Sequence, residues 1–173
     1  MLTPGSILNI PADGRNMFQK GFTIDLRLEL TDLTSGQLLL TAKSGNGKSV
    51  ELRTGEYGSV EIILKDGNNT DIWSSDPGLI PAYGEHCVSV TVDNGPKIIQ
   101  FVVDGNVCNG RDFRQYGWGR FMSEMEDFDF SKIEIRDTLP GQLRPQSKIS
   151  TIRIYSRALM NTGIIGNHRS FME

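Results

Sequence analysis

Acidic side chains gather in the second half of the chain, where residues 124–129 read Glu-Met-Glu-Asp-Phe-Asp and Glu134 and Asp137 follow. Cleavage of a glycosidic bond with retention needs two carboxyl groups about 5 Å apart, and alternate positions of a strand can hold them on one face. The cluster follows residues 111–120, a polar run with glycines that is typical of a loop. We therefore interpret it as a solvated loop, with catalysis as the alternative, and predict no catalytic residue.

Aromatic and basic side chains alternate with glycine just before this cluster. Tyr116 and Trp118 are each followed by glycine, and Arg114 and Arg120 flank them. A flat ring on a loop offers an apolar platform to a ligand, and guanidinium groups around it can donate hydrogen bonds. We predict that these four residues bind a ligand. In the alternative interpretation, Trp118 and Phe121 tuck under the loop and hold it down.

A third aromatic candidate is Trp73, which follows the polar run Asp-Gly-Asn-Asn-Thr-Asp at 66–71. We predict ligand binding for Trp73, with an anchoring role as the alternative. The oxygen atoms of residues 66–71 could hold calcium, but the run lacks the helix-flanked pattern of an EF-hand, and turn chemistry explains each of its residues. His86 and His168 are isolated in the sequence, so we predict no cofactor and no metal ligand, with calcium as the alternative.

The bulk properties of the chain restrict its class. Its 173 residues fit one domain, 1–173. The net charge of −3, with acids and bases interspersed, argues against nucleic acid as a partner, because phosphate binding needs a basic face. Hydrophobic residues make up 38% of the chain without any run long enough to span a membrane. The opening residues 1–5 lack the features of a secretory signal.

Short apolar runs punctuated by glycine and proline dominate the chain, as in all-β folds. The predicted strands are 6–11, 22–30, 37–42, 50–53, 60–64, 86–92, 98–103, 132–136 and 149–155. The fold prediction is an antiparallel two-sheet jelly-roll sandwich with at most one or two short helical turns, the first near Ser156.

The predicted strand 22–30 has a polar face, which carries Thr23, Asp25, Arg27 and Glu29. We interpret it as a solvated face with cross-strand ion pairs; in the alternative, these residues form hydrogen bonds with the hydroxyl groups of a ligand.

The two cysteines, Cys87 and Cys108, are too few for a disulfide-rich scaffold. Turning the hairpin at 93–96 places Cys87 opposite Val102, so a bridge to Cys108 would need the chain to return after residues 104–105. The sequence does not decide between a Cys87–Cys108 disulfide and two free thiols.

Three segments in chain order resemble the laminin-G-like branch of the concanavalin A-like lectin/glucanase superfamily. They are the strand 21–28, the hairpin 86–106 with its Val-Asp-Gly turn, and the closing stretch 152–159, Ile-Arg-Ile-Tyr-Ser-Arg-Ala-Leu. The resemblance implies a jelly-roll sandwich with one convex and one concave sheet, and a superfamily in which calcium is often bound. The chain departs from the pattern at Gly163 and in the long stretch 111–144, and its acidic cluster does not reproduce the carboxylate spacing of the glucanases.

The resemblance, together with the aromatic loop, predicts a non-catalytic carbohydrate-binding module. Its partners would be a polysaccharide or oligosaccharide and an adjacent catalytic domain, because such modules accompany bacterial glycoside hydrolases that are secreted, periplasmic or attached to the cell surface. One alternative is a structural or protein-interaction sandwich that packs on a catalytic neighbour without binding sugar. The other is a glucanase-type hydrolase.

Overall fold

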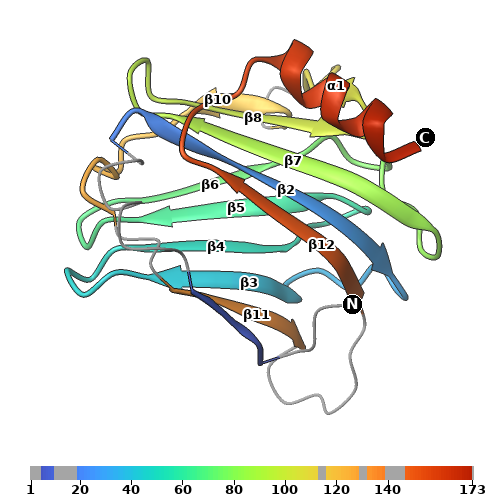
Figure 1. The fold of residues 1–173 in the computed structure, drawn as a ribbon, viewed down its shortest axis with the longest axis horizontal. Coiled ribbons are helices and arrows are strands. Elements are labelled where there is room, and N and C mark those ends of the chain that lie inside the picture. Colours follow the sequence, from blue (N-terminus) through green and yellow to red (C-terminus); the bar gives the residue numbers. More distant parts are fainter. Residues whose placement is uncertain (1–4, 10–18, 113–115, 129–131, 139–146, 173) are drawn as a thin grey trace.

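The computed structural model describes residues 5–9, 19–112, 116–128, 132–138 and 147–172. Two antiparallel sheets pack face to face, with one helix lying across the outer face of the second sheet (Figure 1). Sheet A has the order β1 (Ile7–Asn9), β11 (Lys132–Thr138), β3 (Leu38–Lys43), β4 (Ser49–Thr54), β5 (Val60–Lys65) and β6 (Thr70–Ser74). Sheet B has the order β10 (Trp118–Arg120), β8 (Ile98–Val103), β7 (Glu85–Asp93), β2 (Gly21–Leu30) and β12 (Ser147–Tyr155), and β9 (Asn106–Val107) pairs with β8. The predicted all-β sandwich is confirmed.

Alternation along the strands builds the core. The apolar side chains of β2, from Phe22 to Leu30 at every second position, are all buried between the sheets. They meet the inward side chains of β4, β5, β7 and β8, such as Leu52 and Phe101. Complete burial of one such side chain stabilises the fold by about 1.5–3 kcal/mol. Among the described residues, no helix has the length and apolarity that crossing a bilayer requires.

The polar face of β2 has two different environments. Arg27 pairs with Glu85 at 2.7 Å and Glu29 pairs with Lys148 at 3.2 Å, which confirms the predicted cross-strand ion pairs. Thr23 and Asp25 are instead buried, so the prediction of a solvated face is wrong for this half of the strand. The reason is that the chain after β12 folds back over this part of sheet B (Figure 1).

That covering segment ends in helix α1 (Asn161–Met172), which is longer than the predicted helical turn. Glycine at 163 and 166 disfavours a helix by up to about 1 kcal/mol per residue relative to alanine. Tertiary contacts compensate: Ile164 is buried, and Asn167 donates hydrogen bonds to Asp25 Oδ2 (3.1 Å) and Tyr155 Oη (2.9 Å).

The hairpin of β7 and β8 has a different register from the predicted one. Ser89, not Cys87, lies opposite Val102, because four residues, 94–97, make the turn. Cys87 therefore lies beside Asp104, whose amide donates to the Cys87 carbonyl at 2.9 Å. Both cysteines are free, with Cys108 in the core between the sheets and Cys87 on the outer face of sheet B.

Candidate functional site

Three of the five predicted ligand residues meet at one place on the surface. Trp73, Tyr116 and Trp118 line a hollow of about 370 Å³, which we call the aromatic hollow. Asn109 and Gly119 complete its lining. The hollow lies where β6, an edge strand of sheet A, approaches β10, an edge strand of sheet B. Arg120 is exposed but is not among the lining residues, and Arg114 lies outside the described residues.

Trp73 joins the two sheets. Its register partner is Ile62, a core residue, so its side chain is on the inner side of sheet A. The indole ring packs against the backbone of Gly119: a β-carbon there would lie 1.9 Å from the nearest ring atom. The ring nitrogen donates a hydrogen bond to the carbonyl oxygen of Arg120 at 3.0 Å. Trp73 therefore has the anchoring role given as the alternative, and it also forms one wall of the hollow.

Trp118 presents its ring to solvent. It lies opposite Gln100 in the pairing of β10 with β8, and strand alternation directs it away from the inward side of Gly119. Its side chain is 52% exposed. Trp118 therefore does not tuck under the loop, and its ring is available to a ligand. Tyr116 is half-buried and forms a parallel bridge to Ser74.

A buried carboxylate holds the loop that carries these rings. Asp76, which is 3% exposed, accepts hydrogen bonds from the amides of Asn109 (3.2 Å) and Gly110 (2.8 Å). Gly117 has a φ of +88°, and a β-carbon there would lie 2.5 Å from the Gly110 nitrogen. Its amide donates to the carbonyl oxygen of Ser74 at 2.8 Å. The loop is thus fixed to β6 by backbone contacts that only glycine permits.

A polar hollow of about 280 Å³ adjoins the aromatic one, and Tyr116 lines both. Its other lining residues are Ser35, Arg53, Glu56, Glu61 and Ser74. Arg53 Nε donates to Glu61 Oε2 at 2.7 Å and Ser74 Oγ donates to Glu61 Oε1 at 3.1 Å. This network holds donors and acceptors in fixed positions next to an aromatic ring. Nothing in the residue pattern indicated that β4 and β5 contribute here, because these residues are far from Tyr116 in the sequence.

The acidic cluster has the structure of a surface loop. Glu124 pairs with Lys97 at 3.3 Å, Asp127 pairs with Lys48, and both acids are exposed. Met125 and Phe128 are buried and attach the loop to the core. The two carboxylates thus pair with lysines of two different hairpins, as in a solvated loop.

The turn at residues 66–71 uses its carboxylates as hydrogen-bond acceptors. Asp66 accepts from the amides of Asn68, Asn69 and Glu124, which hold the pKa of its carboxyl well below the usual range. Asp71 Oδ2 accepts from the amide of Ser123 at 2.8 Å. Turn chemistry accounts for the bonds of Asp66 to Asn68 and Asn69. The bonds from Glu124 to Asp66 and from Ser123 to Asp71 are long-range, and they fasten the loop after β10 to sheet A.

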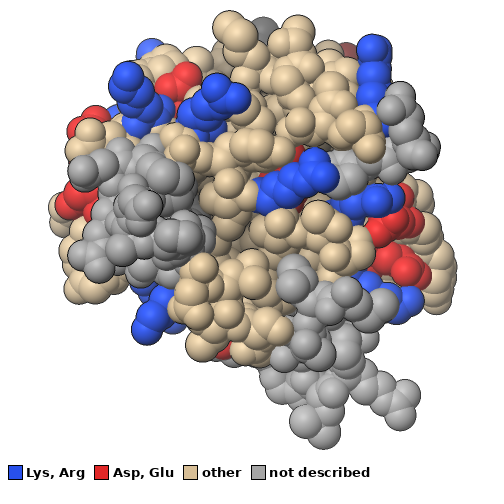
Figure 2. Space-filling model, viewed as in Figure 1, with Lys and Arg blue, Asp and Glu red and all other residues tan. Residues whose placement is uncertain are grey.

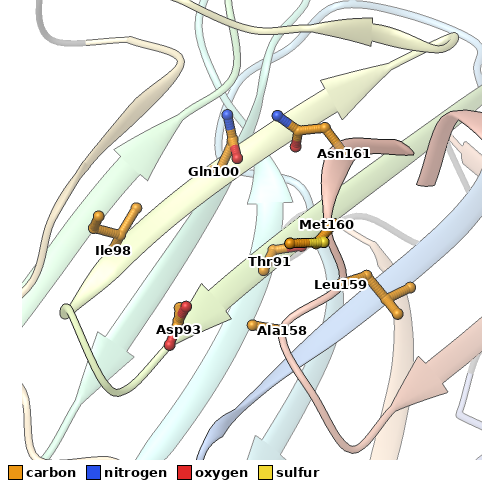
Figure 3. A pocket seen from close by; sticks show the side chains of 8 residues that line it. All are labelled: Thr91, Asp93, Ile98, Gln100, Ala158, Leu159, Met160 and Asn161. Atoms are coloured by element: carbon orange, nitrogen blue, oxygen red, sulfur yellow. The ribbon is translucent and has the colours of Figure 1, made fainter. Parts of the chain in front are cut away.

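A third hollow, of about 410 Å³, which we call the outer-face hollow, lies on the outer face of sheet B beneath the start of α1 (Figure 3). Its lining residues are Thr91, Asp93, Ile98, Gln100, Ala158, Leu159, Met160 and Asn161. The strands supply hydroxyl, carboxylate and amide groups, residues 158–160 supply apolar groups, and the lining contains no aromatic ring. The residue pattern did not reveal it, because it depends on the fold of residues 158–161 over β7 and β8. On this side of the molecule positive and negative side chains are interspersed (Figure 2).

No family model and no curated protein matches the chain. Its fold is similar to that of the CBM40 domain of the Ruminococcus gnavus IT-sialidase bound to α2,3-sialyllactose, with a TM-score of 0.66, 16% identity, and coverage of 96% of this chain and 94% of that one.

Two further solved structures share the fold. The botulinum neurotoxin serotype D binding domain matches with a TM-score of 0.67 and 15% identity, over 95% of this chain and 40% of that one. The SAP-like pentraxin of Limulus polyphemus matches with a TM-score of 0.58 and 11% identity, over 84% and 68%. These similarities establish the β-sandwich fold.

Proposed function

We propose that the chain is a non-catalytic carbohydrate-binding module of the laminin-G-like type, which binds an oligosaccharide or polysaccharide at the aromatic hollow. The observation that carries this proposal is the convergence of Trp73, Tyr116 and Trp118 on one hollow of about 370 Å³. A volume in this range suits a small ligand, and aromatic rings suit the apolar face of a sugar ring.

The proposed roles of the residues follow from their positions. The exposed indole of Trp118 is the platform for one sugar ring, and Trp73 keeps the wall behind it rigid. Asn109 is the polar group of the same hollow. Beyond Tyr116, Arg53 and Glu61 offer fixed polar groups to the hydroxyls of a second unit. Because the two hollows share Tyr116, the arrangement favours a ligand of at least two units over a free monosaccharide.

Solved structures with the same fold also support a carbohydrate ligand. One solved structure with the same fold contains sialyllactose, and another is a further form of that sialidase module. We further propose that this chain serves as an accessory domain of a secreted or cell-surface bacterial glycoside hydrolase. In that role it would raise the concentration of the catalytic domain at a glycan by tethering.

A glycan array followed by calorimetric titration tests the function. We expect wild-type chain to bind at least one glycan at millimolar concentration or below, and Trp118→Ala to weaken binding at least tenfold, about 1.4 kcal/mol. The matched control is Tyr83→Asn, which removes another exposed ring; Tyr83 has a φ of +64°, which asparagine tolerates. If no glycan binds, this proposal is wrong, and the alternative of a sandwich that binds a protein partner without sugar takes its place.

A further inference from the structure

A second chemically distinct cluster lies on the outer face of sheet B, under α1. It combines Cys87 of β7, Asp104 of the turn after β8 and His168 of α1. One potential ligand atom of each residue lies within 4.8 Å of those of the other two. A thiol, a carboxylate and an imidazole are the three side-chain types that bind zinc in proteins.

The fold brings these residues together through two contacts and the turn between them. The hairpin register places Asp104 next to Cys87, and the Cys87 amide donates to Asp104 Oδ1 at 2.8 Å. The chain then turns through positive φ angles at Asp104 (49°) and Gly105 (74°). A β-carbon on Gly105 would lie 2.9 Å from Cδ2 of His168, so the imidazole packs directly against this glycine. The positive φ and this short contact both favour glycine at position 105.

The hydrogen bonding of the cluster is typical of a ligand set. Among the described residues, His168 Nδ1 is buried and has no hydrogen-bond partner, which is a costly arrangement for an imidazole nitrogen. The carboxylate of Asp104 is oriented from behind by His86, whose Nδ1 lies 2.8 Å from Oδ2. Metal-binding carboxylates commonly have such outer partners. In addition, tetrahedral zinc ligands lie about 3.5 Å apart at the usual bond lengths, so small rotamer changes suffice to close the site.

The surroundings of Cys87 do not favour a redox role. Burial, together with the nearby Asp104, Glu85 and Asp25, raises the pKa of the Cys87 thiol, which lowers its reactivity as a nucleophile. The other cysteine, Cys108, is in the core between the sheets and is not a resolving partner.

We propose that Cys87, Asp104 and His168 bind a divalent transition-metal ion of the zinc type, which fastens α1 to sheet B. Three protein ligands leave a fourth position for water. Asn161, the first residue of α1, and Met160 just before it form a wall of the outer-face hollow, so the metal fixes the position of that wall (Figure 3).

Zinc titration of the chelator-treated full chain tests the site, with a chromophoric chelator as competitor. We expect one equivalent of Zn²⁺ to bind, and the midpoint of thermal unfolding to rise by roughly 5–10 °C at a hundredfold excess over the Kd. Cys87→Ser and His168→Gln should each lose this binding and this shift. Cys108→Ala is the matched control, since it removes the other thiol and should keep both.

Cobalt gives an independent readout. With Co²⁺ in place of zinc, the wild-type chain should show a thiolate-to-metal charge-transfer band that Cys87→Ser lacks and Cys108→Ala keeps. Circular dichroism checks that each variant is folded. If Cys87→Ser is unfolded, the zinc affinity of the His168→Gln variant decides whether the site exists. Equal zinc affinity of the wild-type chain and a folded His168→Gln variant, or loss of the cobalt band in Cys108→Ala, would overturn the proposal.

Discussion

Replacing Gly119 by alanine tests how the aromatic hollow is built. In the structure the indole of Trp73 occupies the space where the new methyl group would be, 1.9 Å from its nearest ring atom. The ring must therefore move away, because the backbone of β10 is held by its pairing with β8. Moving it breaks the hydrogen bond from Nε1 to the Arg120 carbonyl and separates the edges of the two sheets.

The expected magnitude follows from these two effects. Forcing an extra methyl group into a packed site costs about 1–3 kcal/mol, and losing the indole hydrogen bond costs about 1 kcal/mol. The lower entropy of the unfolded alanine variant returns about 0.4–1 kcal/mol. We therefore expect Gly119→Ala to lower the free energy of unfolding by about 1–3.5 kcal/mol, equivalent to roughly 2–14 °C in the thermal midpoint.

Urea denaturation followed by tryptophan fluorescence measures this change. The matched control is Gly163→Ala, the same substitution in α1, where a β-carbon meets no atom within 4 Å. It should stabilise the chain by up to about 1 kcal/mol, because alanine is the better helix former. A Gly119→Ala variant within 0.5 kcal/mol of wild type would refute the packing of Trp73 on β10.

Three other substitutions address the supports of the site. Asp76→Ala removes the acceptor of two loop amides and should lower the free energy of unfolding by about 2–3 kcal/mol, measured in urea, because those buried donors lose their partner. Asp66→Asn should cost about 1 kcal/mol at pH 7 at this partly exposed turn. The folded pKa of Asp66 lies below its ordinary 3.8, so the carboxylate stabilises the fold above that pH, and the difference from wild type should shrink as the pH falls below 3.8. Asn167→Ala removes the hydrogen bonds to Asp25 and Tyr155 and should speed hydrogen exchange in α1 while strand β4 stays protected; equal exchange in both proteins would contradict the docking of α1.

Long alternating strands could be predicted from the sequence, whereas short edge strands could not. Strand β2 has five apolar residues at every second position, a pattern that the core requires. Strand β10 is Trp-Gly-Arg and has no such period, because it pairs with β8 through three residues only. Helix α1 is longer than the sequence predicts, because its two glycines oppose helix formation and its stability comes from contacts with sheet B that no local pattern encodes.

The residues of the candidate site also differ in whether the sequence could predict them. Tyr116 and Trp118 were predictable because they are neighbours in one glycine-rich segment. The contribution of Arg53 and Glu61, and the cluster around Cys87, depend on contacts between strands distant in the sequence. The two-residue error in the register of the β7–β8 hairpin hid the cluster around Cys87, because it placed Val102 rather than Asp104 beside that cysteine.

Binding of a glycan at Trp118 can be observed directly, because the chain has two tryptophans and therefore two indole N–H signals in a nitrogen-15 NMR spectrum. Trp118→Phe identifies its signal. The protein is then titrated with the glycan that binds best on the array. We expect a large, saturable shift of the signal of the exposed Trp118 and a smaller shift for Trp73, because the N–H of Trp73 is hydrogen-bonded to β10. A saturable shift of the side-chain amides of Gln100 and Asn161 with Trp118 unchanged would place the ligand in the outer-face hollow and contradict glycan binding at the aromatic hollow.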